Sequence, residues 1–398
     1  MPQTRLLHIS DTHLGKRQYG SDVRRDDFAH VFGRAIKLAV DRDVEAVIHT
    51  GDLFDDPVPS LPTVMECAEL LEPLEKHDIP FYGIVGNHER KNDDQWLDLL
   101  RRTNAVTRLN REAMVVGDVA IYGIDAVRPS VWDTADFELE APPEGAEYSI
   151  LCMHELLDPP AEGVVANYPA NDVLERVNVN LDGLALGDLH QPKSARVDGT
   201  DIWYASATER GAKDQEETGL VQLLEIEDGS LTRRQLELET RPWSVFHIAF
   251  GEDDGAEYVR DVFDRRDLDE AVAKIELTGD RGAVTANEVL QMARDAGAAV
   301  VSVDDNRGRV DINVDSIEAM SLQGLDGAIE ERLADEDFSE VALDVDSRVR
   351  EEEGISDNVN GAATDLEPAI RDRQKIAFDE REALDEKIDA TVTMEGNE

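Results

Sequence analysis

Five short apolar segments of this chain each end directly in side chains that can bind a metal ion. They alternate with segments whose apolar residues recur every three or four positions, as in amphipathic helices. Such alternation predicts an α/β fold, in which the carboxyl ends of parallel strands meet at one edge of a sheet. The five ends are therefore expected to converge. They read Asp11-Thr12-His13, Gly51-Asp52, Gly86-Asn87-His88, His154 and Gly187-Asp188-Leu189-His190.

Each motif has an ordinary structural explanation when it stands alone. Asp-x-His is short enough for any surface turn, Gly-Asp often caps a helix, and Gly-Asn-His fits a turn because Asn tolerates positive φ. A single histidine such as His154 is often a hydrogen-bonded core residue. All these explanations would have to hold at once, so we interpret the five ends as one site. The remaining histidines are interpreted as structural or surface residues: His8, His30, His49, His77 and His247.

The chemistry of these side chains points to a pair of metal ions. Mixed carboxylate, imidazole and amide ligands suit Mn²⁺, Fe²⁺ or Zn²⁺ better than the all-oxygen sites of Ca²⁺. The ligands are too many for one tetrahedral ion but sufficient for two, with Asp52 as the natural bridge. Two ions roughly 3.5–4 Å apart clamp the reacting oxygens in phosphoryl transfer. The expected reaction is phosphoester hydrolysis.

The net charge of −48, from 40 Lys and Arg against 88 Asp and Glu, has two interpretations. An acidic protein should repel nucleic acid. Alternatively, the acidity adapts a halophilic protein to molar salt, which the scarcity of Lys and an aromatic content of only 5% favour. At about 1 M salt the screening length is only ~3 Å, so global repulsion hardly reaches a ligand. The charge therefore does not exclude a DNA substrate.

Cysteine content and hydropathy indicate a cytoplasmic protein. Only Cys67 and Cys152 are present, which cannot build a disulfide framework. No apolar stretch reaches the roughly 18 residues that a membrane span needs, and the start has no signal-peptide pattern. We expect no membrane partner.

The 398 residues divide into four predicted regions. Residues 1–235 contain the five motifs, and residues 240–325 have enough strand and helix signal for a small α/β domain. Residues 326–361 are expected to be an acidic linker. Residues 362–398 are expected to form a C-terminal helix with one apolar face, made by Ile370, Ala377, Leu384 and Ile388.

The motifs together are similar to the five-part signature of the calcineurin-like metallophosphoesterases. This resemblance implies a sandwich of two mixed sheets flanked by helices. The segments Asp11-Thr12-His13-Leu14-Gly15, residues 24–28 and Gly51-Asp52-Leu53-Phe54-Asp55 narrow it further. They resemble the archaeal Mre (meiotic recombination eleven) family of double-strand-break repair nucleases, which is related to bacterial SbcD. The resemblance covers about residues 5–225, and beyond them it rests on length and domain order.

The resemblance implies two Mn²⁺ per subunit, with other divalent ions possible. It implies 3′-to-5′ exonuclease activity on double-stranded DNA and endonuclease activity on single strands. His88 would orient the scissile phosphate or protonate the leaving oxygen. One metal would be held by Asp11, His13, Asp52 and His190, and the other by Asp52, Asn87, His154 and Asp188.

The last motif departs from the family pattern. The family has Gly-His-x-His where this chain has Gly187-Asp188-Leu189-His190. Asp188 can itself ligate Mn²⁺, and its carboxylate should tighten the ion. Alternatively, Asp188 lies outside the ligand shell and a water completes the site.

The family also implies protein partners. Its members form homodimers through two helices, here residues 62–76 and 93–102, which would present Val64, Met65, Leu97 and Leu100. These residues could instead pack within their own domain. The helix of residues 367–390 corresponds in placement to the segment that binds a Rad-type coiled-coil ABC ATPase with a zinc hook, in a heterotetramer. Alternatively, that helix folds back on its own domain. The second domain would cap the nuclease and contact DNA.

Basic residues near the first and third motifs are candidate contacts to DNA ends: Lys16, Arg17, Arg24, Arg25 and Arg90. Surface pairing with Asp22, Asp26 and Asp27 is the alternative for the first four. Two other functions stay open. One is hydrolysis of small nucleotides or cyclic diesters, and the other is a mainly structural role in tethering DNA ends.

Overall fold

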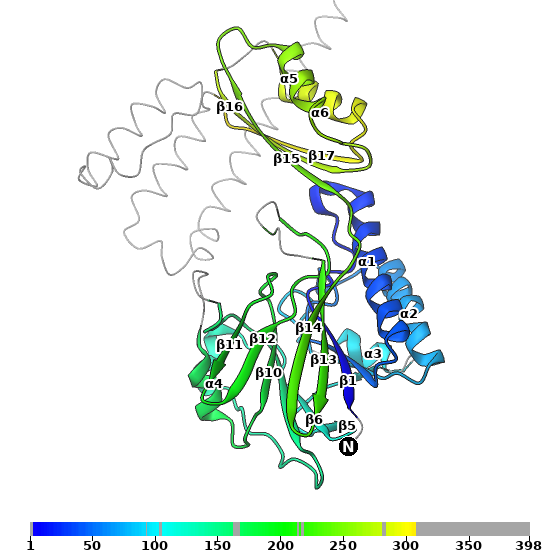
Figure 1. The fold of residues 1–398 in the computed structure, drawn as a ribbon, viewed down its shortest axis with the longest axis vertical. Helices are drawn as coiled ribbons and strands as arrows, with labels where there is room; N and C mark the ends of the chain where they lie inside the picture. The colour runs from blue at the N-terminus through cyan, green and yellow to red at the C-terminus, as the bar shows by residue number, and fades with distance from the viewer. Residues whose placement is uncertain are drawn as a thin grey trace, which may run out of the picture. The chain divides into compact units, whose positions relative to one another are not determined.

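The computed structural model describes residues 3–92, 94–102, 106–161, 168–212, 215, 219–280 and 284–307. Two six-stranded sheets form its larger part (Figure 1). The first has the order β14-β13-β1-β2-β3-β4 and the second β11-β12-β10-β7-β6-β5. The strands of the first are β1 (Thr4–Ile9), β2 (Ala46–His49), β3 (Phe81–Gly83), β4 (Val106–Arg108), β13 (Leu220–Glu227) and β14 (Ser230–Glu237). Those of the second are β5 (Met114–Val116), β6 (Val119–Gly123), β7 (Tyr148–His154), β10 (Gly183–Gly187), β11 (Ser194–Val197) and β12 (Thr200–Tyr204).

Both sheets are mixed. Strands β1 to β4 run parallel, whereas β13 pairs antiparallel with β1 and β14 with β13. In the second sheet β6, β7, β10 and β12 are parallel, and the edge strands β5 and β11 are antiparallel. A core cluster that includes Leu6, Ile48, Ile150 and Trp203 joins apolar side chains of both sheets. This is the sandwich that the resemblance to the metallophosphoesterases implies.

Helices flank the sheets, as Figure 1 shows. On the first sheet they are α1 (Asp22–Asp41), α2 (Leu61–Lys76) and α3 (Trp96–Leu100), with a short 3-10 turn η1 (Gln18–Gly20) before α1. On the second they are α4 (Ala170–Arg176) and the 3-10 helix η2 (Pro129–Thr134), next to a two-stranded pair β8 (Leu157–Asp158) and β9 (Tyr168–Pro169). The helix expected over residues 93–102 is only the five-residue α3.

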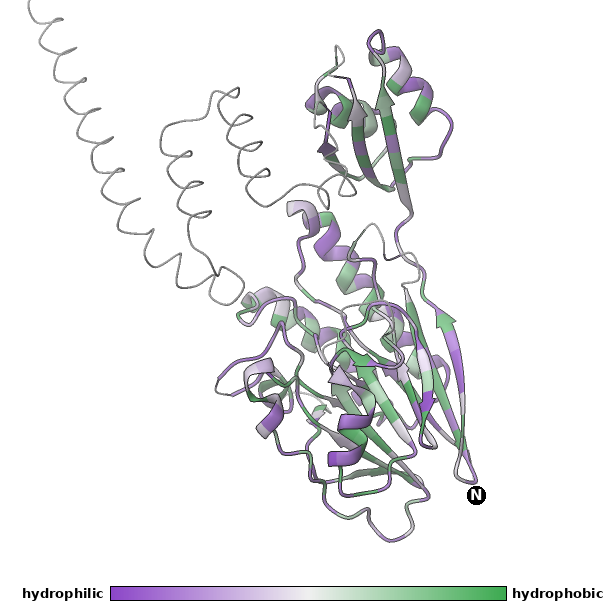
Figure 2. Cartoon of the chain, turned by 90° about the vertical axis from the view of Figure 1, so that its left-hand side faces the viewer, coloured by the Kyte–Doolittle hydropathy of each residue, from purple (hydrophilic) through white to green (hydrophobic). Residues whose placement is uncertain are grey.

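The pattern of apolar residues explains why these helices pack as they do. One face of α1 is fully or almost fully buried, and it is made by Phe28, Val31, Phe32, Ala35, Ile36 and Ala39. A serine before α2 accepts a hydrogen bond from the amide of Thr63 and so caps the helix. Figure 2 shows apolar residues concentrated along the strands and polar residues on the helices. Burial of one helix face against a sheet is the usual source of helix stability in proteins.

A smaller sheet follows at the end of the described chain. Its order is β15-β16-β17, all parallel, with bounds Trp243–Phe250, Val272–Gly279 and Val300–Asp305. Helices α5 (Ala256–Phe263) and α6 (Ala286–Asp295) share an apolar core with it. This matches the small α/β region predicted within residues 240–325.

The described residues belong to one compact unit. The predicted linker and the C-terminal helix lie outside the described residues, and the bounds of the four regions stay predictions. No helix in the described ranges is long and apolar enough to span a bilayer.

Candidate metal centre and active site

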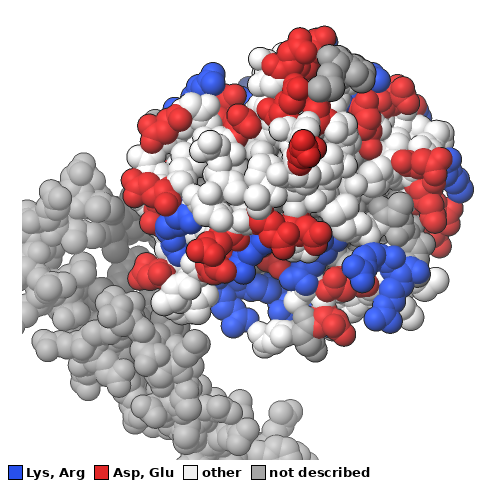
Figure 3. All heavy atoms as spheres, turned by 90° about the horizontal axis from the view of Figure 1, so that it is seen from below, with Lys and Arg blue, Asp and Glu red and all other residues white. Residues whose placement is uncertain are grey.

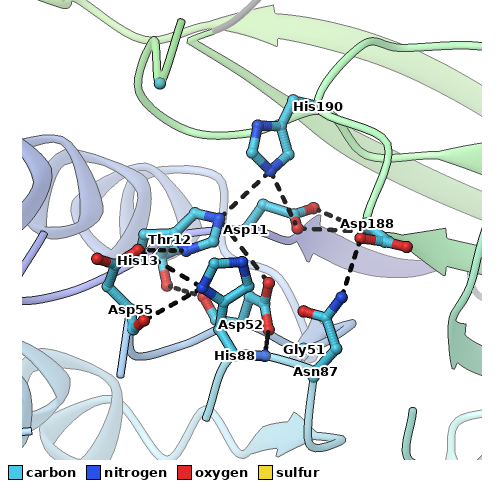
Figure 4. Close-up of polar contacts among 12 residues, drawn as sticks. Asp11, Thr12, His13, Gly51, Asp52, Asp55, Asn87, His88, Asp188 and His190 are labelled. Carbon is cyan, nitrogen blue, oxygen red and sulfur yellow. Dashed lines mark hydrogen bonds and ion pairs between the residues drawn. The ribbon is translucent and has the colours of Figure 1, made fainter. Parts of the chain in front are cut away.

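The five sequence motifs meet at one end of the sandwich. Asp11 and His13 follow β1, Asp52 follows β2, and Asn87 and His88 follow β3, whereas His154 ends β7 and Asp188 and His190 follow β10. Figure 4 shows the labelled side chains among them, from loops of both sheets, pointing toward one another: Asp11, His13, Asp52, Asn87, His88, Asp188 and His190. The parallel strands in each sheet place these ends at the same edge.

The backbone of these loops is strained at the same residues. Asp11, His13, Asp52 and Asp188 have φ values of 51°, 44°, 56° and 83°. Non-glycine residues in this left-handed region cost of order 1–3 kcal/mol each, and they cluster at functional sites. The loops therefore hold these four side chains in directions that relaxed backbone would not give.

One potential cation site is formed by Asp11, His13 and His190. Their ligand atoms all lie within 4.8 Å of one another. The Nε2 atoms of His13 and His190 are 3.3 Å apart, and His190 Nε2 is 3.6 Å from Asp11 Oδ1. His13 Nδ1 lies 3.2 Å from Asp55 Oδ1. A proton on Nδ1 that faces Asp55 leaves the Nε2 lone pair of His13 directed into the site.

A second potential site is formed by Asp11, Asp52 and His154. His154 Nε2 is 3.3 Å from Asp52 Oδ2, 3.8 Å from Asp188 Oδ1 and 4.0 Å from Asp11 Oδ1. This nitrogen is buried and has no hydrogen-bond partner. The ring's other nitrogen, Nδ1, donates to the carbonyl of Thr50 at 2.6 Å. Three carboxylates around this imidazole nitrogen form a set of ligands that could hold a cation.

The electrostatics of these groups also favour a cation bound among them. Burial alone would lower the pKa of His154, but the carboxylates of Asp52, Asp11 and Asp188 hold it well above its usual value. Burial raises the pKa of Asp11 to about 6. Without a positive charge among them, these carboxylates are costly to keep ionised.

Asp52 lies between the two sites. Its Oδ1 accepts the backbone N–H of His88 at 3.0 Å, and its Oδ2 faces His154 at 3.3 Å and His13 at 3.8 Å. Gly86 makes this approach possible, because a Cβ there would lie 2.1 Å from Asp52 Oδ1. Any side chain at position 86 would push the carboxylate away.

Asp188 and Asn87 close the second site from the opposite side. The amide of Asn87 donates to Asp188 Oδ1 at 3.4 Å, and the backbone N–H of Asp188 donates to the Asp11 carboxylate at 3.2 and 3.3 Å. The Asp188 carboxylate is thus directed toward the same space as His154 Nε2. It stands where the family pattern has a histidine.

His88 is the exposed histidine of the group. Its side chain is 46% exposed, and Nδ1 donates to the Asp55 carbonyl at 3.1 Å. That bond leaves Nε2 as the free nitrogen. His88 also groups with His13 and Asp52 at metal-ligand distances.

Asp55 and Lys16 are a part of the site whose role the sequence did not reveal. Lys16 Nζ lies 2.6 Å from Asp55 Oδ1, the same oxygen that faces His13. Although burial alone would raise the pKa of Asp55, its contacts with His13 and Lys16 lower it. The signal was present, because Asp55 ends the second motif. Lys16 is therefore engaged within the site and is not an unpaired surface cation.

The structure contradicts the prediction that Arg24 contacts DNA. Its side chain is 0% exposed and pairs with Asp27 and Glu209 at 2.7 and 3.0 Å. Arg17 and Arg25 are exposed but pair with Asp22, and Arg25 also with Asp26, as the alternative interpretation expected. Arg90 is half-buried and donates to the carbonyl of Ala126 at 2.6 Å. Figure 3 views the protein from the end at which β1 starts, and it shows Lys and Arg gathered on one part of that face.

Three of the four predicted dimer residues are also placed differently. Val64, Leu97 and Leu100 are buried in the core between the helices and the first sheet. Only Met65 is exposed, at 55%. The exposed large apolar residues on and before these two helices are Val58, Leu61, Met65 and Leu99.

Comparison with known proteins adds independent information. The family model described as calcineurin-like phosphoesterase matches residues 4–218. Three curated relatives carry the name "DNA double-strand break repair protein Mre11". The chain is 38% identical to that of Haloferax volcanii (89% of this chain, 79% of the relative) and 33% identical to that of Halobacterium salinarum (98% and 99%). It is 33% identical to that of Methanosarcina mazei (87% and 57%).

Proposed function

This chain belongs to the archaeal Mre11 family of the calcineurin-like phosphoesterases, and from that premise we propose how its site works as a metal-dependent nuclease of DNA double-strand break repair. The proposed reaction is hydrolysis of DNA phosphodiesters at break ends. Two of the relatives come from halophilic archaea, which agrees with the interpretation of the net charge as adaptation to salt.

The observation that carries the proposal is three overlapping groups of potential metal ligands, in which Asp11, His13 and Asp52 each belong to two groups. We assign one divalent ion to Asp11, His13, Asp52 and His190, and a second to Asp52, Asn87, His154 and Asp188. The orphaned Nε2 of His154 supports the second assignment. The mixed nitrogen and oxygen donors suit Mn²⁺, our proposed cofactor. Ions in such positions polarise the phosphoryl oxygens and activate water.

His88 is the proposed catalytic residue of the chain itself. The Asp55 carbonyl holds its Nδ1–H, so Nε2 is the nitrogen available to a phosphodiester. In the protonated ring, Nε2–H donates to a phosphate oxygen or to the leaving oxygen. Its exposure of 46% leaves room for a substrate.

We propose two protein partners, both of which the family resemblance implies. We propose a homodimer, supported by the exposed apolar residues Val58, Leu61, Met65 and Leu99 on one pair of helices and the loop before them. We also propose that residues 362–398 bind a zinc-hook ABC ATPase of the Rad type. Deletion of residues 362–398 should abolish that association and leave nuclease activity intact. Unchanged association would contradict this proposal.

The experiment is cleavage of end-labelled duplex DNA with Mn²⁺ in molar KCl. Mn²⁺-dependent shortening from 3′ ends supports the proposed nuclease. Turnover of small diesters alone would favour a nucleotide phosphodiesterase, and DNA binding without cleavage would favour a tethering protein. His88→Ala should retain DNA binding and Mn²⁺ binding and lose hydrolysis, because its ring lies at the open side of the site.

A further inference from the structure

Two histidines lie buried beneath the metal centre and take no part in the proposed reaction. His8 is in β1 and His49 ends β2, and they are 0% and 1% exposed. Burial lowers the pKa of both imidazoles to about 3, so both rings are neutral at ordinary pH. A neutral imidazole has one donor and one acceptor nitrogen, and which is which depends on its partners.

The partners of His8 settle its tautomer. The indole N–H of Trp203 in β12 points at His8 Nδ1 at 2.9 Å. An indole nitrogen can only donate, so Nδ1 is the acceptor and the proton is on Nε2. His8 Nε2 lies 2.9 Å from the hydroxyl of Thr50 and therefore donates to it. The guanidinium of Arg233 lies over the Trp203 ring, 5.3 Å from its centre, and helps to hold the indole.

The same logic fixes His49. Its Nδ1 accepts the backbone N–H of Gly51 at 3.3 Å, and a backbone N–H can only donate. The proton is again on Nε2, which lies 3.1 Å from the hydroxyl of Thr12. That hydroxyl in turn donates to the carbonyl of Leu53 at 3.2 Å. Both histidines thus donate from Nε2 to a threonine in a metal-binding loop.

These threonines set the position of proposed metal ligands. The carbonyl of Thr50 accepts Nδ1–H of His154, which directs His154 Nε2 toward the carboxylates. The loops have little room to adjust, because a Cβ on Gly187 would lie 2.3 Å from the Thr50 carbonyl oxygen. Thr12 stands between Asp11 and His13 in sequence, and its bond to Leu53 ties the first loop to the loop of Asp52.

We propose that His8 and His49 are positioning residues of the metal centre, each locked as the Nε2–H tautomer by a group that can only donate. Through Thr50 and Thr12 they fix the two loops on which the ligands of both sites stand. Trp203 lies in the second sheet and donates a hydrogen bond to His8 of the first sheet, so the proposed arrangement connects the two sheets. The inference rests on the proposed metal site, but its hydrogen bonds do not depend on a bound ion.

The hydrogen bonds are tested without metal. In the full chain with isotope-labelled histidine, the imidazole nitrogen resonances of His8 and His49 should show protonated Nε2 and unprotonated Nδ1 in wild type. Trp203→Phe keeps an aromatic ring and removes the indole donor to His8 Nδ1, so the His8 resonances should move toward a mixture of tautomers while those of His49 stay. A Nδ1–H tautomer in wild type, or unchanged His8 resonances in Trp203→Phe, would overturn the proposal.

The consequence for the metal is tested by calorimetric titration with Mn²⁺. Loss of a partner that orients a ligand typically weakens metal binding by about tenfold to a hundredfold. We expect that loss for Trp203→Phe and His8→Phe, and a smaller one for His8→Gln, which keeps a donor and an acceptor. Thr4→Val is the matched control, since it removes a buried hydrogen bond, to Asp118, at the far end of β1.

The outcomes separate this inference from the proposed function. Wild-type binding in His8→Phe, or an equal loss in Thr4→Val, would overturn the positioning role while the metal site stands. Absence of Mn²⁺ binding and cleavage in wild type would overturn the metal site itself, and with it the positioning role. The tautomer spectra would then still report the hydrogen bonds.

Discussion

Replacing Arg24 with methionine should destabilise the fold strongly, although the sequence alone made Arg24 a candidate DNA contact. The guanidinium is fully buried and makes four hydrogen bonds. Its partners are the side chains of Gln18, Asp27 and Glu209 and the carbonyl of Arg210, at 2.8, 2.7, 3.0 and 2.8 Å. Methionine has a similar length and no charge, so Arg24→Met removes all four bonds with little loss of volume.

The cost is set by the carboxylates that remain. Asp27 keeps two hydrogen bonds from Arg241, at 2.8 and 2.9 Å. Among the described residues, Glu209 keeps only the backbone N–H of Arg210, its Oε2 has no partner there, and it is 0% exposed. Breaking a buried ion pair by removing one partner costs about 3–5 kcal/mol, because the other charge stays buried. The total free energy of unfolding of a protein is about 5–15 kcal/mol, so this cost is a large fraction of it.

The assay is urea unfolding at constant molar KCl. Arg25→Met is the matched control, because Arg25 is the next residue, is 40% exposed and pairs only with surface acids. We expect its effect to stay within about 0.5 kcal/mol. The double variant Arg24→Met, Glu209→Gln should recover part of the loss. If Arg24→Met is no more destabilising than Arg25→Met, or weakens only DNA binding, the buried-network account is wrong.

Three further predictions follow from the structure. The folded-state pKa of His8, about 3, lies below its unfolded value of 6.5. Between these values His8 binds a proton in the unfolded chain but not in the folded one. The free energy of unfolding should therefore fall as pH drops below about 6.5. In urea unfolding, His8 should lower the folding constant of the wild type roughly tenfold per pH unit. The variant His8→Phe should not show this part of the pH dependence. Asp188→His should retain calorimetric Mn²⁺ binding and Mn²⁺-dependent cleavage, and complete loss of binding would contradict a direct ligand role. Met65→Glu should shift the sedimentation of the protein toward monomer, whereas a strictly monomeric wild type at micromolar concentration would refute the dimer.

Local patterns in the sequence were sufficient to predict the alternation of strands and helices and the convergence of the strand ends. The two-sheet sandwich was implied only by the resemblance to the metallophosphoesterases. Apolar runs and helical periodicity are properties of neighbouring residues. The meeting of Asp11, Asp52 and His154 then follows from a general rule, that parallel strands bring their carboxyl ends to one edge. The metal-ligating residue types marked those ends when the five motifs were taken together, although each motif alone had an ordinary explanation.

The environment of individual side chains was harder to predict, since it depends on partners far away in the chain. Arg24 and Arg25 have the same local composition, but Arg24 meets Glu209, which lies 185 residues later. Helical phase was the available signal. Arg24 precedes Phe28 by four residues and so lies on the buried face of α1, whereas Arg25 does not.

Helical phase also explains the dimer residues. In α2 the buried residues Val64, Cys67, Leu71 and Leu74 repeat at three- and four-residue spacing, which places Met65 on another face. Apolar character alone did not distinguish a residue that packs inside from one that is offered to a partner. The position of a residue relative to the buried face of the helix does distinguish the two cases.

The buried polar groups of this protein offer a physical explanation for how so acidic a chain can act on a polyanion. At about 1 M salt, surface charges interact over only ~3 Å, whereas buried pairs are screened far less. The interactions that define the site are of the second kind: Asp11, Asp52 and His154 are each at most 1% exposed, as are His8 and His49 beneath them. Surface acidity can therefore respond to salt while the buried site keeps its charge and geometry. It follows that cations bound among these carboxylates, rather than the net charge of −48, determine the local potential that a phosphodiester meets.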